Sequence, residues 1–141
     1  MLECTNPECG DKQFPRSDPA VIVLVTHEDR ALLGRKSGWP AGVYSTIAGF
    51  VEPGESLEDA VRREVYEETN IRIATVAYHS SQPWPFPSSI MLGFNATARH
   101  QALRINPHEL AAARWYSPPT SFTARRIRPS ACRAAIRSRA V

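Results

Sequence analysis

Three glutamates close together in one predicted helix carry the first chemical signal in this sequence. Glu64, Glu67 and Glu68 are spaced i, i+3 and i+4, so a helix places their carboxylates on one patch. Like charges at this spacing oppose helix formation by a few tenths of a kcal/mol each, which favours a cation that neutralises them. Ligands that are all oxygen select a hard ion such as Mg²⁺ or Mn²⁺, which also binds substrate phosphates. The patch therefore predicts metal-assisted phosphate chemistry.

The same glutamates also have a simpler interpretation as an ordinary solvated helix face. Glutamate is a good helix former, and Arg62 and Arg63 could pair with these acids at the surface. For the acids taken alone, this simpler interpretation is the better one. The residues around them must decide between the two.

The helix that would hold the acids has clear ends in the sequence. Ser56 followed three residues later by Asp59 forms a capping box. Asn70 favours a helix end because asparagine tolerates the left-handed conformation found there. Apolar residues recur every four positions along the side predicted to face the core, at Leu57, Val61 and Val65.

Short apolar stretches elsewhere predict the strands of a mixed sheet. Ala20–Val25 is continuous, rich in β-branched residues and typical of a buried central strand. A proline-rich loop is expected between two of the later strands, and a short turn or helix at Pro107. The class expected is α+β, a mixed sheet packed between helices. Further strands are predicted at Ala31–Arg35, Tyr44–Val51, Ile71–His79, Ser89–Ala98 and Arg114–Tyr116.

Composition is that of one soluble domain. The 141 residues are 43% hydrophobic and 22% charged, which allows one hydrophobic core. No apolar run approaches the ~20 residues that cross a bilayer, and the first residues lack the basic and apolar regions of a secretory signal. A cytoplasmic location without membrane association is therefore expected. Three cysteines, an odd number, argue against a disulfide framework.

The net charge of +3 is unevenly distributed. Six arginines and no acid follow Ser117, so the rest of the chain has a net charge of −3. Such a tail, residues 118–141, could hold RNA phosphates. A solvated or disordered segment, or a truncated closing helix, is the other interpretation.

The full spacing around the helix resembles the Nudix box. Gly49, Glu55, Arg63, the three helical glutamates and Ile71 occupy its fixed positions, and Asn70 replaces its last glycine. The resemblance implies a Nudix fold with water attacking a pyrophosphate. It also implies that Glu55, Glu64, Glu67 and Glu68 bind Mg²⁺ or Mn²⁺, that Arg63 orients them, and that Gly49 allows close approach of the backbone to the ligand.

A second motif narrows the substrate. Ser81–Ser89 reads SQPWPFPSS, and by itself it could be a proline-rich surface turn or an SH3-type ligand. It is similar to the SQPWPFPxS motif of the NADH pyrophosphatase subfamily of Nudix hydrolases. The resemblance implies substrate-binding roles for Ser81, Gln82, Trp84, Phe86 and Ser89.

The same subfamily carries a zinc ribbon ahead of the Nudix domain. Cys4 and Cys9 resemble its second cysteine pair, which makes residues 1–16 a ribbon remnant before a Nudix domain at 17–117. Because a structural zinc needs four ligands, bound zinc is uncertain. The resemblance also implies that Phe14 and Phe50 stack on the adenine, that Ala124 contacts substrate, and that Glu109 is a further metal ligand or general base. A simple helix-start acid is the other interpretation of Glu109.

The expected reaction is hydrolysis of NADH or NAD⁺ to nicotinamide mononucleotide, reduced or oxidised, and AMP, extending to NAD-capped RNA. The family resemblance also implies a homodimer. One alternative is a Nudix hydrolase of ADP-ribose or another dinucleotide. The other is an inactive nucleotide- or RNA-binding module that uses the arginine-rich tail.

Overall fold

The computed structural model describes residues 2–6, 8–14 and 16–118. The arginine-rich tail from 119 on, with Ala124 and the closing helix expected there, lies outside the described residues. The elements in chain order are β1 (Leu2–Glu3), β2 (Lys12–Gln13), β3 (Asp18–His27), β4 (Arg30–Arg35), β5 (Ile47–Phe50), α1 (Leu57–Thr69), β6 (Ile73–Trp84), β7 (Ser89–Ala98) and β8 (Ala112–Tyr116).

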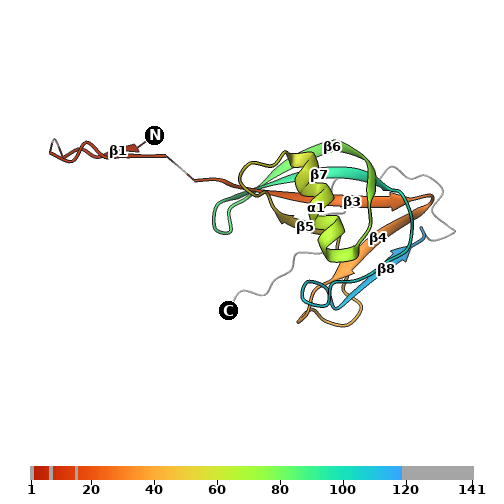
Figure 1. Ribbon diagram of the computed structural model, residues 1–141. Coiled ribbons are helices and arrows are strands. Elements are labelled where there is room, and N and C mark those ends of the chain that lie inside the picture. Colours follow the sequence, from red (N-terminus) through yellow and green to blue (C-terminus); the bar gives the residue numbers. More distant parts are fainter. Residues whose placement is uncertain (1, 7, 15, 119–141) are drawn as a thin grey trace.

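A mixed sheet of six strands forms the body of the protein (Figure 1). Its order is β6-β7-β3-β4-β8, and β5 is added beside β3. On one side β3 runs parallel to β7 from Asp18 to Thr26. On the other side it pairs with β5 through Ala20–Val23 and with β4 through Val25–His27. The predicted central strand is confirmed, since Val21, Val23 and Val25 are fully buried.

Helix α1 crosses the sheet and packs against β3, β5 and β6 (Figure 1). The Ser56 side chain accepts a hydrogen bond from the Asp59 backbone N–H, and Asn70 ends the helix at φ 60°. Both predicted ends are thus confirmed. Val61 and Val65 are fully buried. The glutamates beside this buried side of the helix therefore lie at the border of the core. Among the described residues α1 is the single helix, and it covers one face of the sheet.

The boundaries of several predicted elements change. Ser81–Trp84 was expected to be a loop, which is wrong, because these residues extend β6 and only Pro85–Ser88 make the turn. Proline is compatible with β6 because this strand lies at the edge of the sheet. The strand predicted at Tyr44–Val51 shortens to β5, with an isolated bridge at Ser45. Pro107 begins a turn rather than a helix.

The amino-terminal segment forms a small hairpin of β1 and β2 that projects from the sheet (Figure 1). Cys4 and Cys9 lie in its connecting turn, exposed and not joined in a disulfide. None of the helices in the described ranges has the length and apolar character needed to cross a bilayer.

Candidate active site

Arg63 gathers the acids of the helix and of the preceding loop. Its guanidinium donates two hydrogen bonds to Glu55, of 2.7 and 3.0 Å, and single bonds to Glu64 at 3.0 Å and Glu67 at 3.2 Å. It also donates to the Phe50 carbonyl at 2.9 Å. The bonds from Arg63, followed by one from the Glu52 backbone N–H, hold the pKa of Glu55 below its ordinary value. This fork of bonds holds the carboxylates of Glu55, Glu64 and Glu67 around one guanidinium. The orienting role that resemblance implied for Arg63 stays a prediction.

Gly49 leaves room for the carboxylate of Glu64. A Cβ atom built on Gly49 would lie 1.9 Å from Glu64 Cδ, far inside contact distance. The carboxylate therefore rests directly on the backbone of β5. Burial raises the pKa of Glu64 despite its bond from Arg63. The group next to Gly49 is thus a protein side chain. The close approach of the backbone to a ligand, which the resemblance implied, stays a prediction.

Glu68 is the most deeply buried of the acids. Its side chain is 3% exposed, and its Oε2 atom has no hydrogen-bond partner among the described residues. Its Oε1 atom lies 4.0 Å from Nζ of Lys36, at the end of β4. Burial, reinforced by the charges of Glu64, Glu109 and Glu67, raises the pKa of Glu68 to about 7, although Lys36 opposes the shift. A buried oxygen without a partner is a position where a cation would be stabilised.

Glu109 reaches this region through a loop that is bonded to the end of α1. The Asn106 N–H donates to the Glu68 carbonyl and the Arg104 N–H donates to the Thr69 carbonyl, both at 3.0 Å. Leu110 is buried and its side chain lies opposite Gly34, which anchors the far end of the loop. Glu109 is exposed, and its charge contributes to the raised pKa of Glu68.

These residues make up what we call the glutamate patch: Glu55, Glu64, Glu67, Glu68 and Glu109. Two cations, Arg63 and Lys36, lie among five acids. Carboxylate oxygens alone are a donor set for Mg²⁺ or Mn²⁺, and the unpartnered Glu68 oxygen fits such an ion. Within the described ranges no three His, Cys, Asp or Glu side chains converge in a ready-formed metal cage, and Glu55, Glu64 and Glu67 are each paired with Arg63 instead. Rotation of flexible glutamate side chains would be needed to hold an ion.

Glu68 should make the stability of the metal-free protein depend on pH. Its pKa is about 7 in the folded chain against an ordinary value of 4.5 when the chain is unfolded, so folding takes up a proton between these values. The free energy of unfolding should fall as pH rises from 4.5 to 7, by up to about 3 kcal/mol at ~1.4 kcal/mol per pKa unit. Glu68→Gln should remove this loss. Urea unfolding in EDTA at pH 4.5 and pH 8 measures it.

The matched control for this experiment is Glu58→Gln, since Glu58 is an exposed acid on the same helix and is not among the charges that raise the pKa of Glu68. It should leave the pH dependence of unfolding unchanged. Mg²⁺ or Mn²⁺ should stabilise the unmutated protein at pH 8, because an ion that binds only the folded state shifts the equilibrium toward it. Identical pH dependence in Glu68→Gln and the unmutated protein would show that burial does not raise the pKa of Glu68.

The SQPWPFPSS segment lies at the end of the sheet that also holds Phe50. Trp84 pairs with Ser89, and Ser89 pairs with Asp18 of β3, while Phe50 pairs with the nearby Ala20. One strand, β3, separates this hairpin of β6 and β7 from β5. Trp84 and Phe86 meet edge to face with ring centroids 6.0 Å apart. Ser81, Gln82 and Phe86 are exposed, Trp84 is half-buried and Ser89 is buried.

Of the remaining predicted residues, Phe50 contacts the glutamate patch through its carbonyl, which accepts a hydrogen bond from Arg63. Phe14 is 74% exposed on the segment after β2, and Phe50 is 61% exposed at the end of β5. The pKa of the Cys4 thiol is lowered by hydrogen bonding, first with the Asn6 backbone and then with the Cys9 thiol. These cysteines supply two of the four ligands that a structural zinc needs. The zinc-ribbon remnant stays a prediction.

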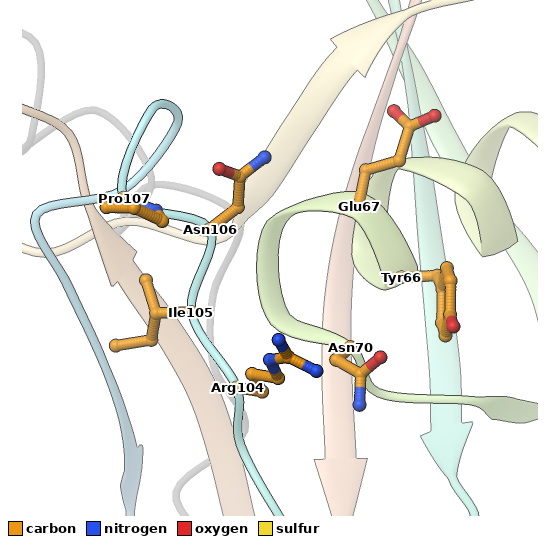
Figure 2. A pocket seen from close by; sticks show the side chains of 7 residues that line it. All are labelled: Tyr66, Glu67, Asn70, Arg104, Ile105, Asn106 and Pro107. Carbon is orange, nitrogen blue, oxygen red and sulfur yellow. The ribbon is translucent and has the colours of Figure 1, made fainter.

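Sequence reasoning missed two features. Lys36 reaches Glu68 from a distant part of the chain, and no local pattern marks it. Two hollows flank Tyr66, and the first, of about 390 Å³, lies between the end of α1 and the loop from Arg104 to Pro107 (Figure 2). The arginines just before β6 and after β7 could have drawn attention to this face, but only the fold brings them together.

Comparison with known proteins places the chain among described families. The NUDIX domain family matches residues 16–130. Nudix hydrolase 19, chloroplastic, of Arabidopsis thaliana is 48% identical over 122 residues, covering 82% of this chain and 28% of the relative. NAD-capped RNA hydrolase NudC of Pseudomonas aeruginosa is 47% identical over 117 residues, covering 83% and 41%. NAD-capped RNA hydrolase NUDT12 of Homo sapiens is 46% identical over 106 residues, covering 74% and 23%. The chain thus spans less than half the length of these relatives.

Solved structures agree on the fold. A NUDIX hydrolase from Nitrosomonas europaea superposes with a TM-score of 0.63 at 23% identity, covering 79% of this chain and 63% of that one. A MutT/nudix family protein from Enterococcus faecalis gives 0.64 at 20% identity, covering 75% and 46%. The mixed sheet, the capped helix and the matched residues lead to one conclusion: the chain belongs to the Nudix family.

Proposed function

We propose that this protein hydrolyses the pyrophosphate of NADH or NAD⁺, free or as the cap of an RNA, with Mg²⁺ or Mn²⁺ bound at the glutamate patch. The supporting observation is that one chain carries both the acids organised by Arg63 and the Trp84 hairpin. Relatives named as NAD-capped RNA hydrolases are 46–47% identical over the matched segments. The buried, unpartnered oxygen of Glu68 supports a cation at this place.

In this proposal a water oxygen bonds to one phosphorus of the substrate while the bridging P–O bond breaks. The products are nicotinamide mononucleotide, reduced or oxidised, and AMP, or an RNA with a 5′-monophosphate. The divalent ions would activate the water and offset charge on the phosphate oxygens. Glu64, Glu67 and Glu68 supply the ligand oxygens with Glu55, and Arg63 keeps these carboxylates oriented. Glu109 would act as a further ligand or accept the water's proton, as the family resemblance implies.

The aromatic side chains at the Trp84 end of the sheet are proposed to hold the bases. Trp84 and Phe86 follow Ser81 and Gln82 in the chain, and Phe50 is exposed two strands away from β6. Stacking of a base on an aromatic ring contributes ~1–3 kcal/mol. Phe14, Ser89 and Ala124 are kept as substrate contacts on the resemblance alone. The homodimer and the cytoplasmic location likewise stay predictions.

A substrate comparison tests the proposal. The purified chain with Mg²⁺ or Mn²⁺ should hydrolyse NADH with a higher kcat/KM than ADP-ribose, and EDTA should abolish both activities. Separation of nucleotides by chromatography identifies reduced nicotinamide mononucleotide and AMP. Preference for ADP-ribose would contradict the NADH assignment in favour of the other dinucleotide hydrolase. No turnover of either, together with RNA binding that is lost when residues after Ser117 are removed, would identify an inactive binding module.

A further inference from the structure

Lys36 follows the last residue of β4 on the side of the sheet that faces α1. Along β4, Leu32 is fully buried, and a Cβ built on Gly34 would lie 3.1 Å from the side chain of Leu110. These alternate positions therefore face the core. Lys36 continues the alternation one residue beyond the strand. Its side chain leaves the sheet on the side of the helix and reaches Glu68.

The backbone around Lys36 is hydrogen-bonded on both sides. The carbonyl of Arg35 accepts a hydrogen bond of 2.8 Å from the Ala111 N–H, and the carbonyl of Lys36 accepts one of 3.3 Å from the Trp39 N–H. The Arg35 guanidinium also donates to the Trp39 carbonyl at 3.2 Å. These bonds hold the backbone in place, so the flexible side chain alone decides where the ammonium lies. The bond from Ala111 also connects this corner to the loop that carries Glu109.

The Lys36 ammonium lies beside the most deeply buried acid of the glutamate patch. Its Nζ atom is 4.0 Å from Oε1 of Glu68, and the Lys36 side chain is 48% exposed while that of Glu68 is 3% exposed. A buried carboxylate is thus contacted by a cation that still has access to water. The Lys36 charge also lowers the pKa of both Glu68 and Glu64, against the larger effect of burial.

A divalent ion at Glu68 would have to share this carboxylate with Lys36. Within the described ranges Lys36 is the ion-pair partner of Glu68, whereas Glu55, Glu64 and Glu67 pair with Arg63. The Oε2 atom of Glu68 is buried without a hydrogen-bond partner there. Because the two oxygens belong to one carboxylate, an ion at Oε2 would lie close to the ammonium near Oε1. Two positive charges so close together repel each other, and burial leaves little water to screen them.

We propose that Lys36 competes with the divalent ion for the carboxylate of Glu68, so that an ion which binds the glutamate patch must displace the Lys36 ammonium. The inference rests on the proposed function, because it places Mg²⁺ or Mn²⁺ at this patch. Lys36 is then a positioning residue, which stabilises Glu68 when no ion is bound and sets the ion concentration at which the site fills. Rotation about the bonds of its flexible stem is enough to move the half-exposed ammonium into water.

Removing the charge tests the competition. The affinity of the full chain for Mn²⁺ is measured by calorimetry at pH 8. Lys36→Gln should bind Mn²⁺ roughly 10-fold more tightly than the unmutated protein, the equivalent of one partly buried ion pair that the ion no longer has to break. Lys36→Arg keeps the charge and should bind Mn²⁺ as the unmutated protein does. An affinity of Lys36→Gln that is equal to or weaker than that of the unmutated protein would overturn the proposal.

The matched control is Arg114→Gln on β8. Arg114 is exposed and pairs with Leu33 of β4, and residues directly opposite each other in neighbouring strands share a face of the sheet. Arg114 therefore lies on the face opposite to Leu32 and Gly34. The substitution removes the same single charge from the far side of the sheet and should leave the Mn²⁺ affinity unchanged. A gain as large as that of Lys36→Gln would mean that net charge sets the affinity, and would overturn the proposal.

Urea unfolding adds a measurement that needs no turnover. In EDTA at pH 8, Lys36→Gln should unfold at a lower urea concentration than the unmutated protein, because the buried Glu68 carboxylate loses its ion-pair partner. Saturating Mn²⁺ should remove or reverse this difference, since an ion that binds the folded state more tightly stabilises it more. A difference of the same size and sign with and without Mn²⁺ would show that Lys36 has a structural role only, and would overturn the proposal.

Hydrolysis of NADH separates this inference from the proposed function. Lys36→Gln should reach half of its maximal NADH turnover at a lower Mn²⁺ concentration than the unmutated protein does. Mn²⁺-dependent turnover with the same half-saturating concentration and the same Mn²⁺ affinity in both proteins would reject the role of Lys36 alone. Tighter Mn²⁺ binding by Lys36→Gln, without turnover of NADH by either protein, would reject the proposed function and still support the competition.

Discussion

Glu67→Gln is expected to lower metal-dependent turnover of NADH by roughly 10²- to 10⁴-fold, which corresponds to ~3–5 kcal/mol of transition-state free energy. The change removes one anionic ligand oxygen without altering side-chain volume. Glu67 is half exposed and its ion pair is the 3.2 Å contact with Arg63, so the fold should lose less than about 1 kcal/mol. Measurements of kcat against Mn²⁺ concentration, with Mn²⁺ affinity from calorimetry, separate weak metal binding from slow chemistry.

Glu58→Gln is the matched control for this experiment. Glu58 is an exposed acid in the first turn of the same helix, and the substitution makes the same change of charge away from Arg63. It should retain nearly full turnover and the Mn²⁺ affinity of the unmutated protein. Full activity in Glu67→Gln would defeat the assignment of the glutamate patch as the metal centre.

Gly49→Ala is expected to lower kcat/KM by roughly 100-fold with little change in the free energy of unfolding. The new Cβ would occupy the position of the Glu64 carboxylate, 1.9 Å from its Cδ atom. That carboxylate is the far end of a flexible side chain, so it would move away while the strand stays in place. Displacement of a catalytic group by about 1 Å can cost about 10² in rate. Steady-state kinetics and urea unfolding measure the two effects.

A double-mutant cycle determines whether Gly49 acts through Glu64. In a Glu64→Ala background the carboxylate is absent, so Gly49→Ala should cause little further loss of kcat/KM. A loss that is as large in both backgrounds would mean that the substitution distorts β5 itself. Strong destabilisation of Gly49→Ala would point to the same cause, because β5 pairs directly with the central strand.

The parts of this fold that depend on neighbours in sequence could be predicted. Ser56 and Asn70 end the helix through bonds to residues within four positions, and the spacing of Val61 and Val65 determines which side faces the core. The continuous run of apolar residues in β3 likewise predicted a central strand from the local sequence. The edge position of β6 could not be predicted in this way. Pro83 excludes a central strand but is compatible with an edge strand, and only the fold shows that β6 lies at the edge.

The candidate site divides in the same way. The spacing of Glu64, Glu67 and Glu68 along one helix determined that their carboxylates share a patch, since helical geometry requires only the local sequence. The tertiary structure decided that Glu68 is buried with an unpartnered oxygen, that Lys36 lies beside it and that Gly49 holds the Glu64 carboxylate. These contacts join residues from different strands and loops, so they depend on how the elements pack, which no local spacing specifies.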